Sequence, residues 1–263
     1  MIDLGLFRDV LASEWTKLRT VRSTYWTTLI AVVLGIGLSA AIAAANEHAY
    51  PKFDAHDRLT FDPTSVSTAG LFFSQLALGV LAIMAISSEY SSGTIRTTLC
   101  AVPQRGYVLA AKSVIVGLTG MVVALATAFG AFFIGQAIFS GRHLNVTLGD
   151  PGVLRAVIGV GLYMAGLMLF AMGLAIIIRH TAGAITTLVG LVFILPAVSN
   201  ALPKNWQHDL ARYFPANAGG AITSVVRDPT NSLGPWTGFG VFAIWVAVAI
   251  GTGWYLLRHR DVQ

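Results

Sequence analysis

The sequence has little charge and almost no cysteine. Of its 263 residues, 11% are charged and 55% are hydrophobic, and there is a single cysteine. One cysteine excludes an intrachain disulfide framework and a thiolate zinc cluster. A mean hydropathy of +0.71 is typical of a chain whose solvent is lipid, and it argues against a soluble globular domain.

Motifs of common catalytic sites are also missing. The sequence contains no Gly-x-x-x-x-Gly-Lys-Ser/Thr phosphate loop, no His-Glu-x-x-His metalloprotease helix and no nucleophile elbow. We therefore expect a protein that is not an enzyme, does not hydrolyse ATP itself and binds no cofactor. A metal site can be drawn from His48, Asp54, His56 and Asp57, but their spacing matches no familiar ligand pattern, and we expect no metal.

Six apolar runs are long enough to cross a membrane. A helix needs about 20 mostly apolar residues to span roughly 30 Å of hydrocarbon, and continuous apolar runs indicate helices rather than barrel strands. The sequence therefore predicts an all-α membrane protein, a single domain over residues 1–263 with a six-span bundle over 24–257. The predicted spans are 24–45, 69–87, 113–139, 156–178, 182–202 and 236–257.

Lysine and arginine are biased to one side of these spans, which predicts the orientation of the chain. The residues assigned to that side are Arg8, Lys17, Arg19, Arg22, Arg96, Arg105, Lys112, Arg179, Arg258 and Arg260. With the N-terminus cytoplasmic, this side carries the formal net charge of +5 and the other side is neutral. We therefore expect both termini in the cytoplasm, and an attraction to anionic lipid rather than to nucleic acid.

The segment before the first span has one apolar face. Its apolar residues recur at three- and four-residue steps over 3–22, which predicts an amphipathic helix in the plane of the lipid headgroups. Glu14, Trp15, Lys17 and Arg19 suit such an interface. We assign residues 1–22 to an interfacial elbow helix; the alternative is a plain membrane anchor that contacts no partner.

A polar island over residues 89–107 separates the second and third spans. Glu89 stands at the membrane boundary, where an ionised carboxylate is unfavourable unless it meets a cation, a helix N-terminus or water. Arg96 and Arg105 are the cations nearest to it in this loop.

The same island has the residues of a short helix. Serine hydroxyls are predicted to cap it and Gly93 to provide a hinge, so that residues 94–99 become helical and Pro103 and Gly106 close the segment. An exposed helix between two spans suits a docking contact. The alternative is an ordinary solvated loop.

Polar residues are rare within the spans. Gln75, Gln136 and Asn200 are candidates for a substrate path, although such amides more often bond to neighbouring helices. Gly120 and Gly161 put small groups on helix faces, which predicts close packing. The middle of each span has no acidic residue, and this argues against a proton-coupled secondary transporter.

The chain between the fifth and sixth spans is too apolar for a solvated loop. Pro203, Pro215 and the Gly219-Gly220 pair interrupt any single helix there. Pro196 is expected to kink the fifth span just before it. The sequence over 203–235 therefore argues against both a solvated loop and a single continuous helix.

Four stretches form a recognisable set, and they are residues 13–20, 89–96, 103–105 and 212–220. Together with the six-span layout, they resemble the permease subunits of type 2 ABC exporters, particularly actinobacterial ones. The motif in the loop between the second and third spans is the most specific part of this resemblance.

The resemblance implies a function, a location and partners. In such permeases the elbow lies on the cytoplasmic face, and the loop after the second span carries a coupling helix that docks in a groove of a separate ATP-binding subunit. The segment after the fifth span, matched here by 203–235, folds as short helices that partly re-enter the outer membrane face. The matched coupling residues are Glu89, Gly93, Thr94, Ile95, Arg96, Thr97 and Arg105.

The resemblance thus implies the membrane-spanning subunit of an ATP-driven exporter in a bacterial plasma membrane. Its partners would be an ATP-binding subunit that holds ATP and Mg, the surrounding lipid and a second permease chain, identical or paralogous. Two other classes share the topology: a secondary transporter and an ATP-independent membrane scaffold or sensor. Binding of an ATPase to the loop between the second and third spans would distinguish an ABC permease from a secondary transporter and from a scaffold or sensor.

Overall fold

The computed structural model describes residues 4–102, 104–199, 210–226 and 232–259. Within these ranges the chain forms helices and connecting loops, without a strand. Six helical segments are long and apolar enough to cross a membrane, which confirms the predicted all-α, six-span fold. They cover Arg22–Lys52, Leu71–Tyr90, Gly106–Arg142, Val153–Ile178, Thr181–Val198 and Pro235–His259.

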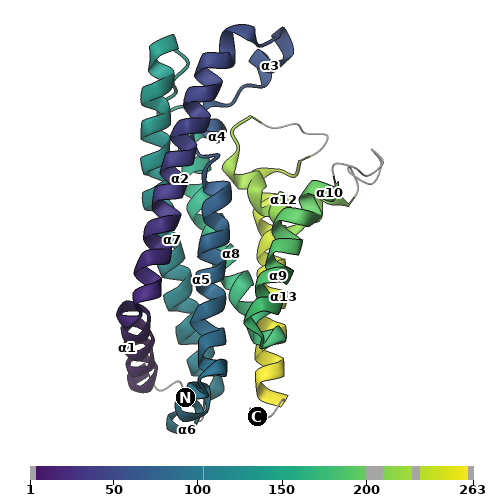
Figure 1. The fold of residues 1–263 in the computed structure, drawn as a ribbon. Helices are drawn as coiled ribbons and strands as arrows, with labels where there is room; N and C mark the ends of the chain where they lie inside the picture. Colours follow the sequence, from purple (N-terminus) through teal and green to yellow (C-terminus); the bar gives the residue numbers. More distant parts are fainter. Residues whose placement is uncertain (1–3, 103, 200–209, 227–231, 260–263) are drawn as a thin grey trace.

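The helices form one bundle, and both ends of the chain lie at the same end of it, as an even number of crossings requires (Figure 1). We call this the N/C end and the opposite end the loop end. The helices of the first half are α1 (Leu4–Thr20), α2 (Arg22–Ala49), η1 (Tyr50–Lys52), α3 (Ala55–Thr60), α4 (Pro63–Ser67), α5 (Leu71–Ser91), α6 (Thr94–Ala101) and α7 (Arg105–Phe139). Those of the second half are η2 (Ser140–Arg142), α8 (Val153–Ile178), α9 (Thr181–Val189), η3 (Gly190–Ile194), α10 (Leu195–Ser199), η4 (Ala211–Tyr213), α12 (Pro215–Gly220), η5 (Ala221–Thr223) and α13 (Pro235–His259).

Helix α8 is the centre of the bundle, since most of its side chains are buried and it packs against α5, α7 and α13. Gly159, Gly166 and Gly173 recur along it at seven-residue steps, which places them on one face. A Cβ atom at Gly166 would lie 2.6 Å from the ring of Phe242, and one at Gly173 would lie 2.8 Å from Ala249. The missing side chains therefore let α13 lie directly against α8.

Close packing also holds α7 against α8, as the small residues predict. A Cβ atom at Gly161 of α8 would lie 2.6 Å from the Leu125 side chain of α7. One at Gly120 of α7 would collide with the Met168 sulfur of α8. Both glycines named in the sequence analysis thus lie at this helix contact.

The third span is longer at its N-terminal end than the sequence predicts. Helix α7 has 35 residues, about 52 Å at a rise of 1.5 Å per residue, so it extends beyond a hydrocarbon core of roughly 30 Å. The prediction that Gly106 closes the preceding loop is wrong, because Gly106 lies in the first turn of α7. The side chain of Lys112, assigned to the flank of this span, is buried between helices instead.

The fifth span is irregular where a kink was predicted. Helix α9 passes into the π-helical turn η3, in which the Leu195 N–H donates to the Gly190 oxygen. Proline at position 196 has no N–H to donate, and its ring crowds the preceding turn. The helix therefore widens by one residue directly before Pro196.

Short helices are present in the described part of the segment between the fifth and sixth spans. Ala218 of α12 and Ile222 of η5 are fully buried, so this segment packs into the loop end of the bundle. A Cβ atom at Gly159 of α8 would lie 2.6 Å from the Ile222 oxygen. Gly159 therefore allows η5 to pack closely against α8, as Gly166 and Gly173 do for α13.

Asp62 connects the segment between the fifth and sixth spans to α4 by hydrogen bonds. Its Oδ1 accepts from the Thr64 and Ser65 N–H groups at 2.9 and 3.1 Å, which caps α4. Its Oδ2 accepts from the Val225 and Val226 N–H groups at 2.9 and 3.0 Å. One buried carboxylate thus joins α4 to a strip of chain more than 160 positions away.

Candidate functional site

Helix α1 lies at the N/C end beside α7, as Figure 1 shows in purple. Its apolar stripe turns Val10 toward the bundle, and Glu14 on the same face is also buried. Trp15 and Arg19 point outward and are exposed. A helix is therefore present where the sequence predicts the elbow, with an acidic residue on its buried face.

Glu89 lies near the end of α5 and is only 7% exposed. The Nζ atoms of Lys17 and Lys112 both donate to its Oε1 at 2.9 Å. The side chains of Arg96 and Arg105, the cations predicted as its partners, lie outside the described part of the structure, so that prediction stays untested. The two lysines reach Glu89 because α7 continues toward the N/C end and α1 packs beside α7.

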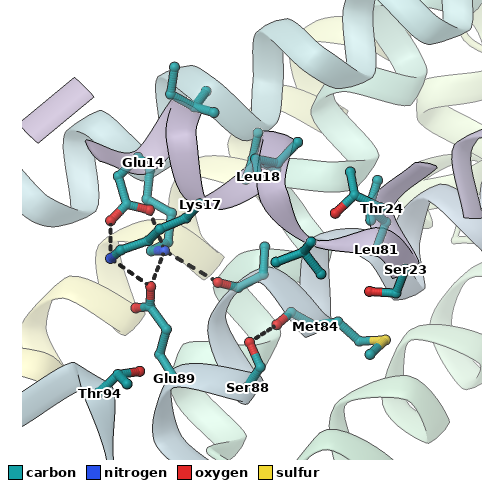
Figure 2. A pocket seen from close by; sticks show the side chains of 15 residues that line it. Glu14, Lys17, Leu18, Ser23, Thr24, Leu81, Met84, Ser88, Glu89 and Thr94 are labelled. Atoms are coloured by element: carbon teal, nitrogen blue, oxygen red, sulfur yellow. Dashed lines mark hydrogen bonds and ion pairs between the residues drawn. The ribbon is translucent and has the colours of Figure 1, made fainter. Parts of the chain in front are cut away.

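Glu14 completes this group of charges. Its Oε1 accepts from Lys17 Nζ at 2.7 Å, and its Oε2 accepts from Lys112 Nζ at 2.5 Å. We call Glu14, Lys17, Glu89 and Lys112 the ion cluster. Figure 2 shows the side chains of Glu14, Lys17 and Glu89 converging from α1 and α5. With two carboxylates and two ammonium groups, the cluster is formally neutral.

The hydrogen-bonding capacity of the cluster is almost filled. An ammonium has three donors, and Lys112 places its third on the Ala85 oxygen at 3.2 Å. Lys17 uses two donors within the cluster and leaves the third for another acceptor. Glu89 Oε2 is buried and has no hydrogen-bond partner among the described residues. The cluster therefore leaves one ammonium donor and one buried carboxylate oxygen without a partner among the described residues.

The surroundings of Lys17 favour its charged form. Partial burial opposes the charge, but hydrogen bonds and Coulomb attraction from Glu14 and Glu89 outweigh it and raise the pKa of Lys17 above 10.5. Removing one member of a buried ion pair costs about 3–5 kcal/mol, because it leaves an uncompensated charge. The ion cluster therefore holds α1, α5 and α7 together as one unit.

Helix α6 follows the cluster almost directly. Ser92 and Gly93 join it to α5, and Gly93 has φ of +71°, in the left-handed region that glycine adopts most easily. The predicted hydroxyl cap is wrong, since the Ser92 hydroxyl donates back to the Ser88 oxygen at 2.7 Å. Thr94 and Thr97 are exposed, while the side chains of Ile95, Arg96 and Arg105, and all of Pro103, lie outside the described part.

Tyr90 connects the same end of α5 to the second half of the bundle. The guanidinium carbon of Arg179 lies 5.5 Å from the centre of its ring, a cation–π contact. Arg179 adopts φ of +56° in the turn between α8 and α9. Two successive residues of α5, Glu89 and Tyr90, thus contact elements on either side of it.

A cavity of about 300 Å³ lies beside the ion cluster, between α1, the start of α2, α5 and α7. We call it the α1 cavity. Its wall is mostly apolar, and the ion cluster forms its polar end (Figure 2). The apolar residues that line it are Leu18, Val21, Leu81, Met84, Ala85, Ile115 and Val116.

A second cavity of about 260 Å³ lies toward the loop end, between α4, α5, α8, the irregular fifth span and α12. Gln75 lines it and accepts a hydrogen bond from the Tyr163 hydroxyl at 2.9 Å. Asn217 and Ser224 are further polar residues of its wall, and none of its described lining residues is charged. We call it the loop-end cavity.

Gln136, another candidate path residue, is held by hydrogen bonds to neighbouring elements. The amide of Gln136 donates to Ser67 at 2.9 Å and accepts from the Val146 N–H at 2.8 Å. Gln136 lines neither cavity and ties α7 to its neighbours. Asn200 lies outside the described residues. Of the two candidates in the described part of the chain, Gln75 is thus the one that lines one of these two cavities.

The outer-loop histidines and aspartates do not form a metal site within the described ranges. No group of three or more metal-binding side chains is found there. Asp54 instead caps α3 by accepting from the Asp57 N–H at 2.7 Å.

Sequence reasoning missed three residues that the structure singles out: Lys112, Tyr163 and Asp62. Lys112 was assigned to the cytoplasmic flank, although its position inside a long apolar run was a signal of burial. Tyr163 of the fourth span is not among the predicted path residues. Asp62, immediately before Pro63, has the form of a helix cap, but its contact with residues 225–226 has no local signal.

Comparison with known protein families gives a match over most of the chain. Over residues 10–197, well over half of the chain, the sequence matches the family described as ABC-2 family transporter protein. The matched range contains the whole ion cluster, α6 and the loop between the second and third spans. A comparison with curated proteins finds no match.

Proposed function

The chain belongs to the ABC-2 family of transporter proteins, and from this premise we propose that it is the membrane-spanning permease subunit of an ATP-driven exporter. A separate subunit binds ATP and Mg and supplies the energy, because this sequence has no phosphate loop. The permease itself binds no cofactor.

Helix α6 is the proposed docking element for the ATP-binding subunit. It is a short helix at the N/C end whose described side chains include the exposed Thr94, Thr97 and Cys100. The observation that carries the proposal is the ion cluster. It joins the end of α5, which directly precedes α6, to α1 and α7 through ion pairs of 2.5–2.9 Å. A displacement of α6 is therefore transmitted to three helices together.

A second connection extends this movement to the rest of the bundle. Tyr90 moves with Glu89 because they are adjacent in α5, and its contact with Arg179 leads to the turn between α8 and α9. Helix α8 is the centre of the bundle, and α13 packs closely on it. The proposed output is an outward opening at the loop end.

The substrate path is proposed to lie between this chain and a second permease chain, identical or paralogous. The loop-end cavity would form part of it, with Gln75 and Tyr163 on its wall. Its uncharged polar and apolar lining suits a neutral or amphipathic substrate. The direction of transport is outward, as in the exporters that the sequence resembles.

The orientation that fits this mechanism has the N/C end in the cytoplasm of a bacterial cell and the loop end outside its plasma membrane. The basic residues of the sequence gather on the cytoplasmic side in this arrangement. ATP is available there, and α6 then faces its partner.

Gentle-detergent purification of the chain from its native membrane tests the proposal. The bound proteins are identified and their ATPase activity is measured, for the native chain and for a Glu89→Ala, Arg96→Ala double variant. A matched control removes the same residue types at the loop end, where Glu47 and Arg142 form an ion pair at 2.5 Å.

We expect a P-loop ATPase to purify with the native chain and with the Glu47→Ala, Arg142→Ala control. In the Glu89→Ala, Arg96→Ala variant the ATPase is lost or no longer responds to the permease. Purification of the intact chain without any ATPase would overturn the proposal in favour of the secondary transporter or the scaffold.

A further inference from the structure

The wall of the loop-end cavity contains a polar group that its protein neighbours leave without a partner. Gln75 of α5 lines the cavity and is only 3% exposed. Its Oε1 accepts from the Tyr163 hydroxyl at 2.9 Å, whereas its Nε2 donates to no described residue. An amide NH₂ without an acceptor is unfavourable away from water, and most buried amides in proteins are bonded.

The unpaired NH₂ group of Gln75 faces the cavity. Its Nε2 does not belong to the polar atoms that are buried without a hydrogen bond, so it retains accessible surface. Because the residue is so little exposed and lines this cavity, that surface faces the cavity. Tyr163 fixes the orientation, since its hydroxyl proton has Gln75 Oε1 as its acceptor. The amide thus presents N–H donors to an occupant.

The other groups of the wall define what this occupant is. The hydroxyls of Ser65, Thr68 and Thr223 already donate to protein oxygens, at 2.7, 3.1 and 2.8 Å. None of the described lining residues is charged, so a charged ligand would meet no counter-ion there, and an unpaired charge is very unfavourable away from water. The cavity therefore suits an uncharged group with an acceptor oxygen.

The apolar part of the wall lies between two spans. Leu71 and Phe72 line it from the second span, and Val192 and Pro196 line it from the fifth. Phe72 is half exposed. The volume of about 260 Å³ is slightly below that of pockets that enclose drug-sized ligands, roughly 300–1,000 Å³. The cavity therefore suits the head of an amphiphile whose apolar chain continues past Phe72.

We propose that the loop-end cavity binds an uncharged amphiphile through a carbonyl oxygen that accepts from Gln75 Nε2. A carbonyl fits better than a hydroxyl, because it has acceptor lone pairs and no proton that needs a partner of its own. Gln75 is the binding residue, and Tyr163 is a positioning residue that holds the amide. The inference rests on the proposed function only where it identifies this ligand as the class of substrate that the permease exports.

Native mass spectrometry of the purified full chain tests the binding. Four compounds of one chain length are added separately at equal concentrations. Methyl palmitate has an uncharged carbonyl, hexadecane has no polar group, palmitate is anionic and hexadecylamine is cationic. We expect methyl palmitate to bind with an apparent affinity roughly tenfold higher than each of the other three, because it alone gains the hydrogen bond without burying a charge.

Three variants make the test specific to the Gln75 amide. Gln75→Leu removes the donors and should abolish the preference for methyl palmitate over hexadecane. The matched control Gln136→Leu removes a buried amide of α7 that lines neither cavity, and it should keep the preference. Tyr163→Phe should reduce the preference to roughly threefold, because the Gln75 amide is then free to turn.

Infrared spectroscopy provides a second measurement that needs no variant. The band of an isotope-labelled carbonyl in methyl palmitate should move to lower frequency on binding to the native chain, because an accepted hydrogen bond weakens the C=O bond. Equal affinity of the native chain for methyl palmitate and hexadecane, an unchanged preference in Gln75→Leu or an unshifted band would overturn the inference. No ATPase is present in these measurements, so their failure is distinguishable from failure of the proposed function.

Discussion

The ion cluster places two lysines and two glutamates within hydrogen-bonding distance at the N/C end. Such a group stabilises the chain only while its charges balance, because each buried charge has lost its hydration. Glu89 and Lys112 are the two members that join α5 to α7. Their removal, singly and together, therefore measures what the cluster contributes.

Glu89→Gln and Lys112→Met are each expected to lower the free energy of unfolding by about 3 kcal/mol, because each leaves an uncompensated buried charge. The double variant retains the neutral pair of Glu14 and Lys17. Its loss is expected to be smaller than the sum of the single losses by about 1 kcal/mol or more. Denaturant titration of the purified chain in micelles measures all three.

Arg19→Gln is the control for this cycle, since Arg19 lies on the same helix α1 but is exposed. It should change stability by no more than about 0.5 kcal/mol. Additive losses in the double variant would show that Glu89 and Lys112 do not interact, and would remove the link from α5 to α7.

Lys17 makes a pH-dependent contribution whose sign follows from its pKa. The pKa is raised above 10.5 in the folded chain, so the stabilisation is fully present below that value and is lost as the pH rises through the folded pKa. As the pH rises above 10.5, the melting temperature of the native chain should fall more steeply than that of Lys17→Arg, since arginine stays charged there. Parallel slopes would contradict the assignment.

The sequence predicts which charged side chains need a partner better than it predicts which residues those partners are. The sequence predicted that Glu89 needs a cation, since an ionised carboxylate at the membrane boundary is unfavourable. It did not predict Lys17 and Lys112, because these lysines are 72 and 23 positions away and only the packing of α1 and α7 brings them close. Local sequence contains no measure of such distances.

At the scale of elements, two different contacts hold the segment of residues 210–226 in place. Asp62 bonds to its backbone from one side, and Gly159 gives η5 close approach to α8 on the other. Each of these two contacts can be tested separately by one substitution.

Asp62→Asn should free the segment at Val225 and Val226. An amide group has one acceptor oxygen and one NH₂, so it cannot accept from both the α4 N–H groups and the Val225 and Val226 N–H groups. Hydrogen exchange within 210–226 is expected to rise roughly tenfold, as the loss of about 1.5 kcal/mol implies, while α8 stays protected. The exposed Asp57→Asn is the control, and unchanged exchange in the Asp62 variant would refute the anchor.

Gly159→Ala should destabilise the bundle, because its Cβ would lie 2.6 Å from the backbone oxygen of Ile222. We expect a loss of about 1–3 kcal/mol. Gly240→Ala in α13 meets no atom within 4 Å and should be neutral or stabilising by up to about 1 kcal/mol, since alanine favours helix. Thermal melts of both variants decide the matter, and equal melting temperatures would contradict the packing argument.

Element positions followed well from the sequence where one physical signal dominated. Continuous apolar runs predicted all six spans, because only a helix satisfies its backbone in lipid. The predicted start of the third span is too late, because a lysine at position 112 is typical of a charge that flanks a span. Lys112 is buried only because Glu14 and Glu89 form ion pairs with it. The cap of α6 was also mispredicted, because Ser92 bonds backward to α5 and the left-handed Gly93 makes the turn.

For the whole molecule, the account places the docking helix and both termini at one end and the outward opening at the other. The arrangement of spans supports this geometry, with α6 at the N/C end and α3 at the loop end (Figure 1). The central claim is that α6 binds an ATP-binding subunit. The only cysteine of the chain is exposed on this helix, at Cys100, and so it reports directly on what lies against α6.

A photo-crosslinker attached to Cys100 in native membranes, followed by identification of the captured protein, tests the claim most directly. The control chain carries Cys100→Ser with Leu59→Cys, which moves the probe to an exposed position of α3 at the loop end. The account predicts that the Cys100 probe captures a P-loop ATPase and that the Leu59→Cys probe does not. Capture of no ATPase from Cys100, in membranes where the chain is folded and labelled, would contradict it.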